Sequence, residues 1–455
     1  MSINQKKINI YIPIEIKKRE LLSKIILSTF IIKNDKLKTR CYIGYKTQIK
    51  KLISFKKSYG GIFIYIGGLP YNQMEKIKSK VEKFINLDEE MGPPANEWLE
   101  TSMPKRLWEG TEKYVDKSYT IGKYAFDISK KVFPRLSSKT VMTGWPRVDL
   151  WRPEFDYIYK NSIENLRKEY GNFILFSSDF TFNSQKRINR EEEFWRNSEW
   201  KTMSKNLTNI KNVAQRVLSE FQETMKLIYE LDKRTDIPLI IIRPHPSDDL
   251  LEWKKIAKSL KRIKIIYKGE VTSWVYASSG VLHRGCTCAI EAYMAGIQTG
   301  YIYTKEKWLR KSLPHEVSKH LYNSDEIAEF CKNNIDKKPL PPEEYNDAFK
   351  NKIHVEKKFA CQLIAEDLLK SDLVSELPHY HNGIVNILDT VKVNLIKIKS
   401  SIIRFIKKYK MGVLLPNKME GGITKKEIND ILKNFEPDHN LKVRQVLTDC
   451  VEIDN

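Results

Sequence analysis

Short apolar runs alternate with amphipathic stretches along the first part of the chain. The runs at residues 8–14 (INIYIPI) and 61–66 (GIFIYI) predict buried strands, and residues 17–32 carry apolar side chains at helical spacing. The second run ends in a pair of glycines followed closely by proline, which is a turn signal. Strand and helix alternating at this spacing predict βαβ units and a parallel sheet.

This pattern pauses at residues 141–153 (VMTGWPRVDLWRP), where a glycine, two prolines and two tryptophans indicate a tight, aromatic connection. It resumes at Gly171 and includes a long helical stretch over residues 187–233. Further strands are predicted at residues 173–178, 237–242, 264–268, 278–283 and 299–304. We therefore predict an α/β protein whose parts are a first domain at 1–153, a second at 154–380 and a helical basic tail at 381–455.

The composition narrows the class of protein. The 455 residues are 41% hydrophobic, which is too apolar for a disordered chain, and no run reaches the ~18 apolar residues of a membrane-spanning helix. Six cysteines show no disulfide spacing, and the first residues lack a signal-peptide pattern. We therefore expect a cytoplasmic protein with reduced thiols.

The charge is strongly positive, with 79 Lys and Arg against 57 Asp and Glu, for a net charge of +22. Such a charge fits a nucleic-acid partner, an anionic membrane surface or the background composition of a lysine-rich chain. The cations are spread along the chain, and no nucleic-acid-binding module is recognisable. We therefore predict no nucleic-acid partner.

A first group of polar residues follows an apolar strand in the segment IPLIIIRPHPSDD. In open α/β sheets, ligands collect at the carboxyl ends of the strands. The segment delivers Arg243 and His245 to such an end, and Ser247 is placed to cap the next helix. These three residues are candidates for binding a nucleotide. The alternative is that His245 only satisfies local carbonyls, while Arg243 pairs with Asp248 or Asp249.

A second junction lies in the segment SSGVLHRGCTCAIEA. A strand is predicted to end at His283, and a helix to begin near Cys286 and Thr287. The free amide groups and positive dipole of a helix start bind anions, Gly285 lets a phosphate approach, and Arg284 can neutralise it. The segment therefore predicts a site for the phosphate of a nucleotide.

The same helix carries a candidate ribose ligand. Glu291 lies four residues after Thr287 on one helix face, where a carboxylate can accept hydrogen bonds from both ribose hydroxyls. The alternative is that Glu291 is a solvated helix residue and Arg284 a surface charge. Cys286 and Cys288 have no second Cys or His pair at metal-binding spacing, so we interpret them as small buried residues.

The acidic triplet Asp88, Glu89 and Glu90 is the candidate catalytic group of the first domain. An acceptor hydroxyl loses a proton as it attacks, and a carboxylate is a suitable general base. Three consecutive carboxylates cannot all point inward, so at most two serve. The alternative is an exposed acidic loop without a catalytic role.

Six segments in the same order carry a resemblance to a known family. They are IYIPIEIKKREL, LDEEMG, VMTGWPRVDLWRPEF, FILFSSDFTFN, RPHPSDD and HRGCTCAIEAYMAGI. Over most of residues 8–305 the chain resembles the bacterial surface carbohydrate biosynthesis proteins, which are glycosyltransferase-like chains of the GT-B fold. The resemblance implies two Rossmann-like domains that face a cleft, with an acceptor bound mainly by the first and a nucleotide sugar mainly by the second.

The RPHP segment is also similar to the His-Pro motif of GT-B enzymes that use CMP-activated acidic sugars, the sialyltransferases and Kdo transferases. That similarity implies that His245 binds or protonates the leaving phosphate and that Ser278 and Ser279 add hydrogen bonds. It further implies that Glu89 or Glu90 is the base or nucleophile. The position of the catalytic carboxylate stays open, because Met91 separates the triplet from the next glycine.

The resemblance implies a glycosyltransferase that moves a sugar, such as a CMP-activated nonulosonic acid or Kdo, to a growing surface polysaccharide or a lipid-linked acceptor. The sequence has no D-x-D motif at a strand end, and GT-B enzymes generally use no metal, so we predict no metal and no cofactor besides the nucleotide sugar. Three alternatives stay open. They are a hydrolysing UDP-sugar 2-epimerase, although its expected S-D-S-G-G run is missing, a CDP-glycerol glycerophosphotransferase-like enzyme, and a non-catalytic scaffold of polysaccharide assembly.

The predicted tail contains a basic amphipathic pattern. Residues 391–410 hold seven Lys and Arg and no acidic residue, interleaved with Leu, Ile and Phe. This pattern is typical of a helix that lies on anionic lipid, here the cytoplasmic face of the inner membrane. The alternative is a helix that crosses between domains and packs on the core, with its lysines in solvent.

Overall fold

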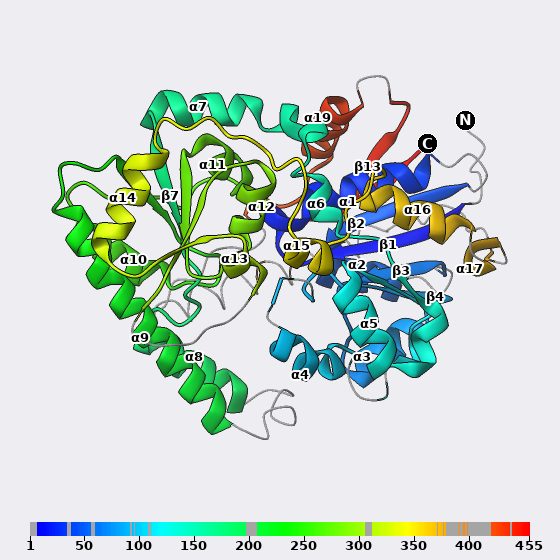
Figure 1. The fold of residues 1–455 in the computed structure, drawn as a ribbon. Coiled ribbons are helices and arrows are strands. Elements are labelled where there is room, and N and C mark those ends of the chain that lie inside the picture. Colours follow the sequence, from blue (N-terminus) through cyan, green and yellow to red (C-terminus); the bar gives the residue numbers. More distant parts are fainter. Residues whose placement is uncertain are drawn as a thin grey trace. The chain divides into compact units, whose positions relative to one another are not determined.

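The computed structural model describes residues 7–33, 38–55, 60–91, 93–94, 96–107, 110, 112–196, 207–304, 312–370, 372–375, 377–378, 391, 395, 398, 420–436 and 439–455. The chain divides into two compact units (Figure 1). Unit 1 comprises Met1–Ile158, Tyr345–Lys397 and Lys418–Asn455, and unit 2 comprises Tyr159–Glu344 and Ile398–Asn417.

Unit 1 is built on a sheet whose described part contains six parallel strands in the order β2-β1-β3-β4-β5-β6. The strands are β1 (Ile8–Ile14), β2 (Thr39–Tyr45), β3 (Ile62–Tyr65), β4 (Lys83–Leu87), β5 (Lys117–Thr120) and β6 (Thr140–Met142). Helices between them include α1 (Lys17–Ile32), α2 (Lys46–Phe55), α3 (Tyr71–Lys78), α4 (Asn96–Arg106) and α5 (Lys123–Val132). The strand order reverses between β1 and β3, which makes that point the switch point of a doubly wound sheet.

The last residues of the chain extend this sheet. β14 (Cys450–Asp454) pairs antiparallel with β2, and β13 (Lys442–Leu447) pairs antiparallel with β14. The prediction of a helical tail over 381–455 is therefore wrong for these residues. β14 is mostly buried because it completes the hydrogen bonds of the β2 edge, a partner about 400 residues away along the chain.

Residues 345–370 also belong to unit 1, which corrects the predicted second domain of 154–380. Helix α16 (Ala360–Lys370) starts on Asp149, whose carboxylate accepts the backbone N–H groups of Ala360 and Cys361, both at 2.8 Å. Burial raises the pKa of Asp149 to about 6, although these N–H groups oppose the shift. Gly144 has φ +90°, and a Cβ there would lie 2.6 Å from the carbonyl oxygen of His354. The segment that contains Trp145 and Trp151 thus contacts residues 354–361, which come from much later in the chain.

Unit 2 has a second sheet, all parallel over its described strands, in the order β12-β11-β10-β7-β8-β9. The strands are β7 (Phe173–Ser177), β8 (Leu239–Arg243), β9 (Lys264–Ile265), β10 (Gly280–His283), β11 (Thr299–Ile302) and β12 (Lys319–Leu321). Numbered from β7, this is the Rossmann order 3-2-1-4-5-6, with its switch point between β7 and β10.

The helices of unit 2 cover a core of aromatic and branched side chains. They include α7 (Lys160–Tyr170), α8 (Gln185–Arg196), α9 (Leu207–Asp232), α10 (Leu250–Ala257), α11 (Thr272–Ala277), α12 (Cys288–Met294) and α14 (Ser324–Asn334). The predicted α/β class, with two Rossmann-like units, is confirmed.

Candidate functional site

The loops that follow β7 and β10 meet at the carboxyl edge of the unit 2 sheet, at its switch point. Ser177, the last residue of β7, places its Oγ 3.2 Å from Cys286 Sγ and 3.3 Å from Cys288 Sγ. Both cysteines are buried, as predicted. Gly285 has φ +128°, and a Cβ there would meet no atom within 4 Å. The edge therefore has room for a ligand beside Gly285.

His245 is held in a fixed orientation within the loop of residues 244–249, here called the His245 loop. Its Nδ1 accepts the backbone N–H of Ser247 at 3.2 Å and lies 2.6 Å from Ser247 Oγ. Thr181 Oγ1, from the loop after β7, lies 2.9 Å from the same Oγ. Because Nδ1 is an acceptor, the proton of the neutral ring resides on Nε2. His245 thus has a hydrogen-bond donor at Nε2.

A buried carboxyl group, Asp248, anchors the His245 loop, and the sequence did not reveal this role. Its Oδ2 accepts from Ser178 Oγ at 2.5 Å, Trp253 Nε1 at 2.9 Å and the backbone N–H of His245 at 3.0 Å. Burial raises the pKa of Asp248 to about 7, although the first two donors oppose the shift. The sequence feature that corresponds to this role is the pair Asp248 and Asp249 directly before the following helix.

Asp249, rather than Ser247, caps helix α10. Its side chain accepts the backbone N–H of Leu251 at 3.0 Å, and it occupies the position before the first helical residue. The predicted cap is therefore wrong by two residues. Ser247 is left to contact His245 and Thr181 instead.

Arg243 points away from this network. Its guanidinium donates to the backbone carbonyls of Lys268 and Gly269, the latter at 3.2 Å, and lies 5.0 Å from the centre of the Trp274 ring. Burial lowers its pKa. The alternative pairing with an aspartate of the His245 loop is not among its contacts with the described residues, and its predicted contact with a phosphate stays a prediction. Arg243 stabilises the turn after β9.

Arg284 is also committed to contacts within unit 2. Its guanidinium forms an ion pair with Glu220 of α9 at 2.9 Å and donates to the carbonyl of Ile302 at 2.6 Å. It also lies 5.6 Å from the centre of the Tyr301 ring. The alternative of a surface charge is wrong, since only 5% of the side chain is exposed. The predicted role in neutralising a phosphate is not supported either, because its charge is already paired.

His283 is a structural residue at the end of β10. Its Nδ1 accepts the backbone N–H of Gly285 at 3.0 Å, and its Nε2 lies 2.8 Å from Ser318 Oγ. Burial lowers its pKa to about 3, and Arg284 and His315 add to the shift. The ring is therefore neutral, and it supports the turn at Gly285 instead of binding a ligand itself.

Ser278 and Ser279 lie at the opposite edge of the sheet, which corrects their assignment to the nucleotide site. β10 begins at Gly280, so both serines precede the strand, and its four residues span about 13 Å to the carboxyl edge. Ser278 Oγ donates to the carbonyl of Val275 at 2.7 Å. Ser279 lines a pocket with Gln298 at the amino ends of the strands.

Helix α12 begins where the sequence predicted. Thr287 is the N-cap residue of α12, and Glu291 lies in the first turn of the helix. Glu291 is fully buried, so the alternative of a solvated residue is wrong. Its candidate role as a ribose ligand stays a prediction.

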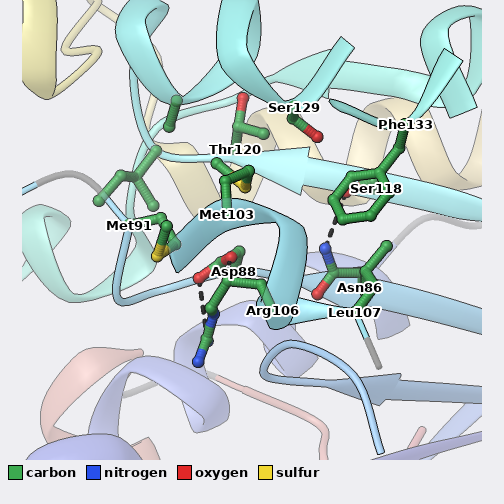
Figure 2. Close-up of a pocket in the computed structure, with 12 residues that line it drawn as sticks. Asn86, Asp88, Met91, Met103, Arg106, Leu107, Ser118, Thr120, Ser129 and Phe133 are labelled. Atoms are coloured by element: carbon green, nitrogen blue, oxygen red, sulfur yellow. Dashed lines mark hydrogen bonds and ion pairs between the residues drawn. The ribbon is translucent and has the colours of Figure 1, made fainter. Parts of the chain in front are cut away.

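The acidic triplet follows β4 at the carboxyl edge of the unit 1 sheet. Arg106 holds Asp88 through two contacts, Nε to Oδ2 at 3.2 Å and Nη2 to Oδ1 at 3.1 Å (Figure 2). Nη1 of Arg106 donates to Glu90 at 3.2 Å, and Arg19 lies 3.6 Å from the other oxygen of Glu90. Burial alone would lower the pKa of Arg106, but Asp88 and Glu90 raise it above its ordinary value.

Asp88 and Arg106 border a pocket, and Figure 2 shows them facing each other beside it. Its other lining residues are Asn86, Met91, Met103, Leu107, Ser118, Thr120, Ile121, Ala125, Ser129 and Phe133. Asn86 donates to Ser118 Oγ at 2.8 Å, so the pocket lining includes a polar pair.

The other members of the triplet differ in exposure. Glu89 is buried and forms an ion pair with the buried Lys24 at 2.7 Å, whereas the side chain of Glu90 is 47% exposed. The alternative of an exposed acidic loop is therefore wrong for Asp88 and Glu89. Of the three, Glu90 is the most exposed to solvent. The cations Arg19, Lys24 and Arg106 were missed because nothing local in the sequence links them to the triplet.

The described residues contain neither a cluster of metal ligands nor a membrane-spanning helix. No three His, Cys, Asp or Glu side chains among them come together as a metal site, and metal independence stays a prediction. None of the described helices is long and apolar enough to cross a membrane.

No protein-family model and no curated protein sequence matches the chain. Among solved structures, the UDP-GlcNAc 2-epimerase of Methanocaldococcus jannaschii has a TM-score of 0.49 and 12% identity, covering 80% of this chain and 100% of that one. S. aureus MnaA bound to UDP has a TM-score of 0.47 and 12% identity, and the match covers 83% of this chain and 100% of that one. The wall teichoic acid polymerase TagF has a TM-score of 0.45 and 11% identity, and the match covers 82% of this chain and 90% of that one. These are distant likenesses.

Proposed function

We propose that the chain is a metal-independent glycosyltransferase of bacterial surface carbohydrate synthesis. Its donor is a nucleotide sugar, with a CMP-activated acidic sugar as the first candidate, and its acceptor is a polysaccharide or lipid-linked glycan. The observation that carries the proposal is His245 at the carboxyl edge of a Rossmann sheet, with its ring oriented by Ser247 and its backbone by Asp248. A fixed donor at this edge suits a phosphate group.

Unit 2 is the donor-binding part in this proposal. The glycosidic carbon–oxygen bond to the donor phosphate breaks, and the phosphate leaves with an additional negative charge. Nε2–H of His245 donates a hydrogen bond to that oxygen, which stabilises the charge without requiring a metal. Gly285 leaves space for the phosphate, and Glu291 binds the ribose.

Unit 1 supplies the base. The acceptor hydroxyl gives its proton to Glu90 as its oxygen forms the new bond to the sugar. Arg106 and Arg19 hold the Glu90 carboxylate in place, while Asp88 and Glu89 serve the structure through their own cation partners. This division assigns one catalytic carboxylate within the triplet.

A binding screen tests the proposal. CMP, UDP, GDP and CDP-glycerol are titrated by calorimetry into the wild type, Glu291→Gln and His245→Asn. We expect one nucleotide class to bind, and both variants to weaken it by roughly 10-fold or more. Absence of binding by all four, or equal binding by both variants, would overturn the assignment.

The turnover assay separates the alternatives. Release of nucleotide that depends on an added glycan acceptor supports a glycosyltransferase. Consumption of a UDP-sugar without an acceptor would assign an epimerase, and turnover of CDP-glycerol would assign a glycerophosphotransferase. Binding without turnover of any donor would favour a scaffold.

A further inference from the structure

The two cations that the sequence assigned to phosphate, Arg243 and Arg284, are both used inside unit 2. A nucleotide bound at this edge therefore needs another source of positive charge. In the Rossmann order of unit 2, β7 is the first strand, and α8 is the helix that follows it. The helix after the first strand is the one whose amino terminus meets the phosphates in such folds.

Helix α8 begins against the His245 loop. Asn183 Nδ2 donates to the carbonyl of Asp249 at 3.1 Å and Asn183 Oδ1 accepts its N–H at 2.8 Å. Ser184 Oγ donates to the Asp249 carboxylate at 3.0 Å and accepts the N–H of Arg187 at 3.1 Å, which caps the helix. These bonds, with the Thr181–Ser247 contact, fix the start of α8 beside His245.

Arg187 lies in the first turn of α8 and is only 7% exposed. Its Nη1 pairs with Glu191, but its buried Nε has no hydrogen-bond partner among the residues that the structure describes. A buried N–H without a partner is costly and calls for an explanation. An anion that accepts a hydrogen bond from Nε would satisfy this group, and the observation is independent of the helix terminus.

Arg190 lies three residues after Arg187, about one helical turn further along α8, and is partly buried. Within the described part of the chain it forms no ion pair. Burial and, to a smaller extent, repulsion from Arg190 lower the pKa of Arg187 to about 10, although Asp249 and Asp248 oppose the shift. Arg187 and Arg190 are three positions apart on α8, which places them on one face of the helix, and the charge of Asp249 acts on both guanidinium groups.

We propose that Arg187 and Arg190, with the amino terminus of α8, form the phosphate subsite of the donor nucleotide beside His245. This inference rests on the proposed function and deepens it. The anion is a phosphoryl or diphosphate group, which accepts charge-assisted hydrogen bonds from guanidinium and backbone N–H groups together. Its binding removes the repulsion between the two arginines and gives Arg187 Nε a partner.

Calorimetric titration of the full-length chain tests the subsite with three probes: inorganic pyrophosphate, CMP and cytidine. Arg190→Gln is the main variant, and Arg187→Lys is the second because Arg187 is buried. Lys258→Gln is the matched control, since it removes a positive charge from an exposed position of unit 2 at the far end of α10. We expect ~10- to 100-fold weaker binding of CMP and pyrophosphate by Arg190→Gln, a smaller loss in Arg187→Lys, and wild-type binding by Lys258→Gln.

The probes separate this inference from the proposed function. Equal loss in Lys258→Gln and Arg190→Gln would overturn the subsite, because binding would then depend on general charge only. Undiminished CMP binding by both arginine variants would overturn the subsite and leave the nucleotide site standing. Pyrophosphate binding that needs Arg190, with no binding of any nucleotide, would support the anion subsite and overturn the proposed function.

Discussion

The carboxyl edges of the two sheets differ in how they handle charge. At the end of β4 in unit 1, each carboxylate of the acidic triplet is matched by a cation from Arg106, Lys24 or Arg19. In unit 2, hydroxyl groups and the Asp248 carboxyl hold the His245 loop, and two arginines on α8 repel each other nearby. The first edge suits a neutral hydroxyl that gives up a proton, and the second suits an anion.

The largest expected effect tests the role of the unit 1 edge. Glu90→Gln removes the accessible base but keeps the shape of the side chain, so turnover of the donor identified by the binding screen is expected to fall ~10²- to 10⁴-fold. The measurement is nucleotide release with donor and acceptor saturating. Glu75→Gln, on the exposed side of α3, serves as the control and is expected to keep the wild-type rate. An active Glu90→Gln variant would remove Glu90 from the mechanism.

The next effect concerns the stability that the buried pair gives to the same edge. Lys24→Met leaves the Glu89 carboxylate buried without its cation, and the expected loss is about 3–5 kcal/mol in the free energy of unfolding. Denaturant unfolding measures it. The double variant Lys24→Met/Glu89→Leu is expected to recover most of this loss, because no unpaired charge stays buried.

The control for this pair lies on the surface of the same unit. Lys123 and Asp127 form an exposed pair on α5, with 65% and 54% of their side chains exposed. Lys123→Met is therefore expected to change stability by less than about 0.5 kcal/mol. Similar losses in Lys24→Met and Lys123→Met would contradict the contrast between buried and exposed pairs.

Asp248 predicts a pH dependence that belongs to unit 2. Its folded-state pKa, about 7, is above the ordinary value of an aspartate, so between roughly pH 4 and 7 the folded state binds a proton that the unfolded state lacks. Stability is therefore expected to fall as pH rises through this range, at up to about 1.4 kcal/mol per pH unit. Unfolding of the wild type and Asp248→Asn at several pH values measures the slope.

The comparison variant for this slope is Asp149→Asn in unit 1. Burial raises the pKa of Asp149 to about 6, so its contribution has the same sign and ends about one pH unit earlier. Asp248→Asn is expected to flatten the upper part of the wild-type profile, and Asp149→Asn only the part below about pH 6. Identical profiles for Asp248→Asn and the wild type would show that Asp248 does not titrate in this range.

Local pattern was sufficient where neighbours along the chain decide the structure. Ile8–Ile14 and Lys17–Ile32 were predicted with the bounds that the structure has, because apolar spacing alone distinguishes the strand from the helix. Lys442–Leu447 was not predicted as a strand, since its hydrogen bonds depend on β14 and, through it, on the distant β2 edge. Arg284 was assigned to phosphate because its partner, Glu220, lies 64 positions earlier on another helix.

The same limit applies to the His245 loop. The sequence identified His245 and Ser247 by residue type and position, and the structure brings them into contact. It did not identify Asp248 as the anchor, because that role depends on Ser178, 70 positions earlier in the chain. Charged residues at strand ends were thus recognised, but their partners were not.

The smallest expected effect concerns the predicted basic helix at residues 391–410, most of which lies outside the described residues. Three of its positions are described, and all three are helical and exposed: Val391 at 47%, Leu395 at 59% and Ile398 at 56%. Their spacing of four and three places them on one helix face. Exposed apolar side chains at these three positions are what a helix that lies on anionic lipid needs, and lipid binding stays a prediction.

Vesicle flotation measures this preference. Leu395→Asn/Ile398→Asn is expected to weaken binding to vesicles of phosphatidylcholine and phosphatidylserine by roughly 10-fold, because two apolar side chains no longer enter the lipid interface. Leu340→Asn is the matched control, since Leu340 is an 83% exposed leucine outside residues 391–410. Equal flotation of the double variant and the wild type, or equal losses in the double variant and the control, would mean that this face does not contact lipid. The lysines of the basic helix would then be solvent-exposed residues without a role in lipid binding. Any membrane attachment would have to come from another part of the chain.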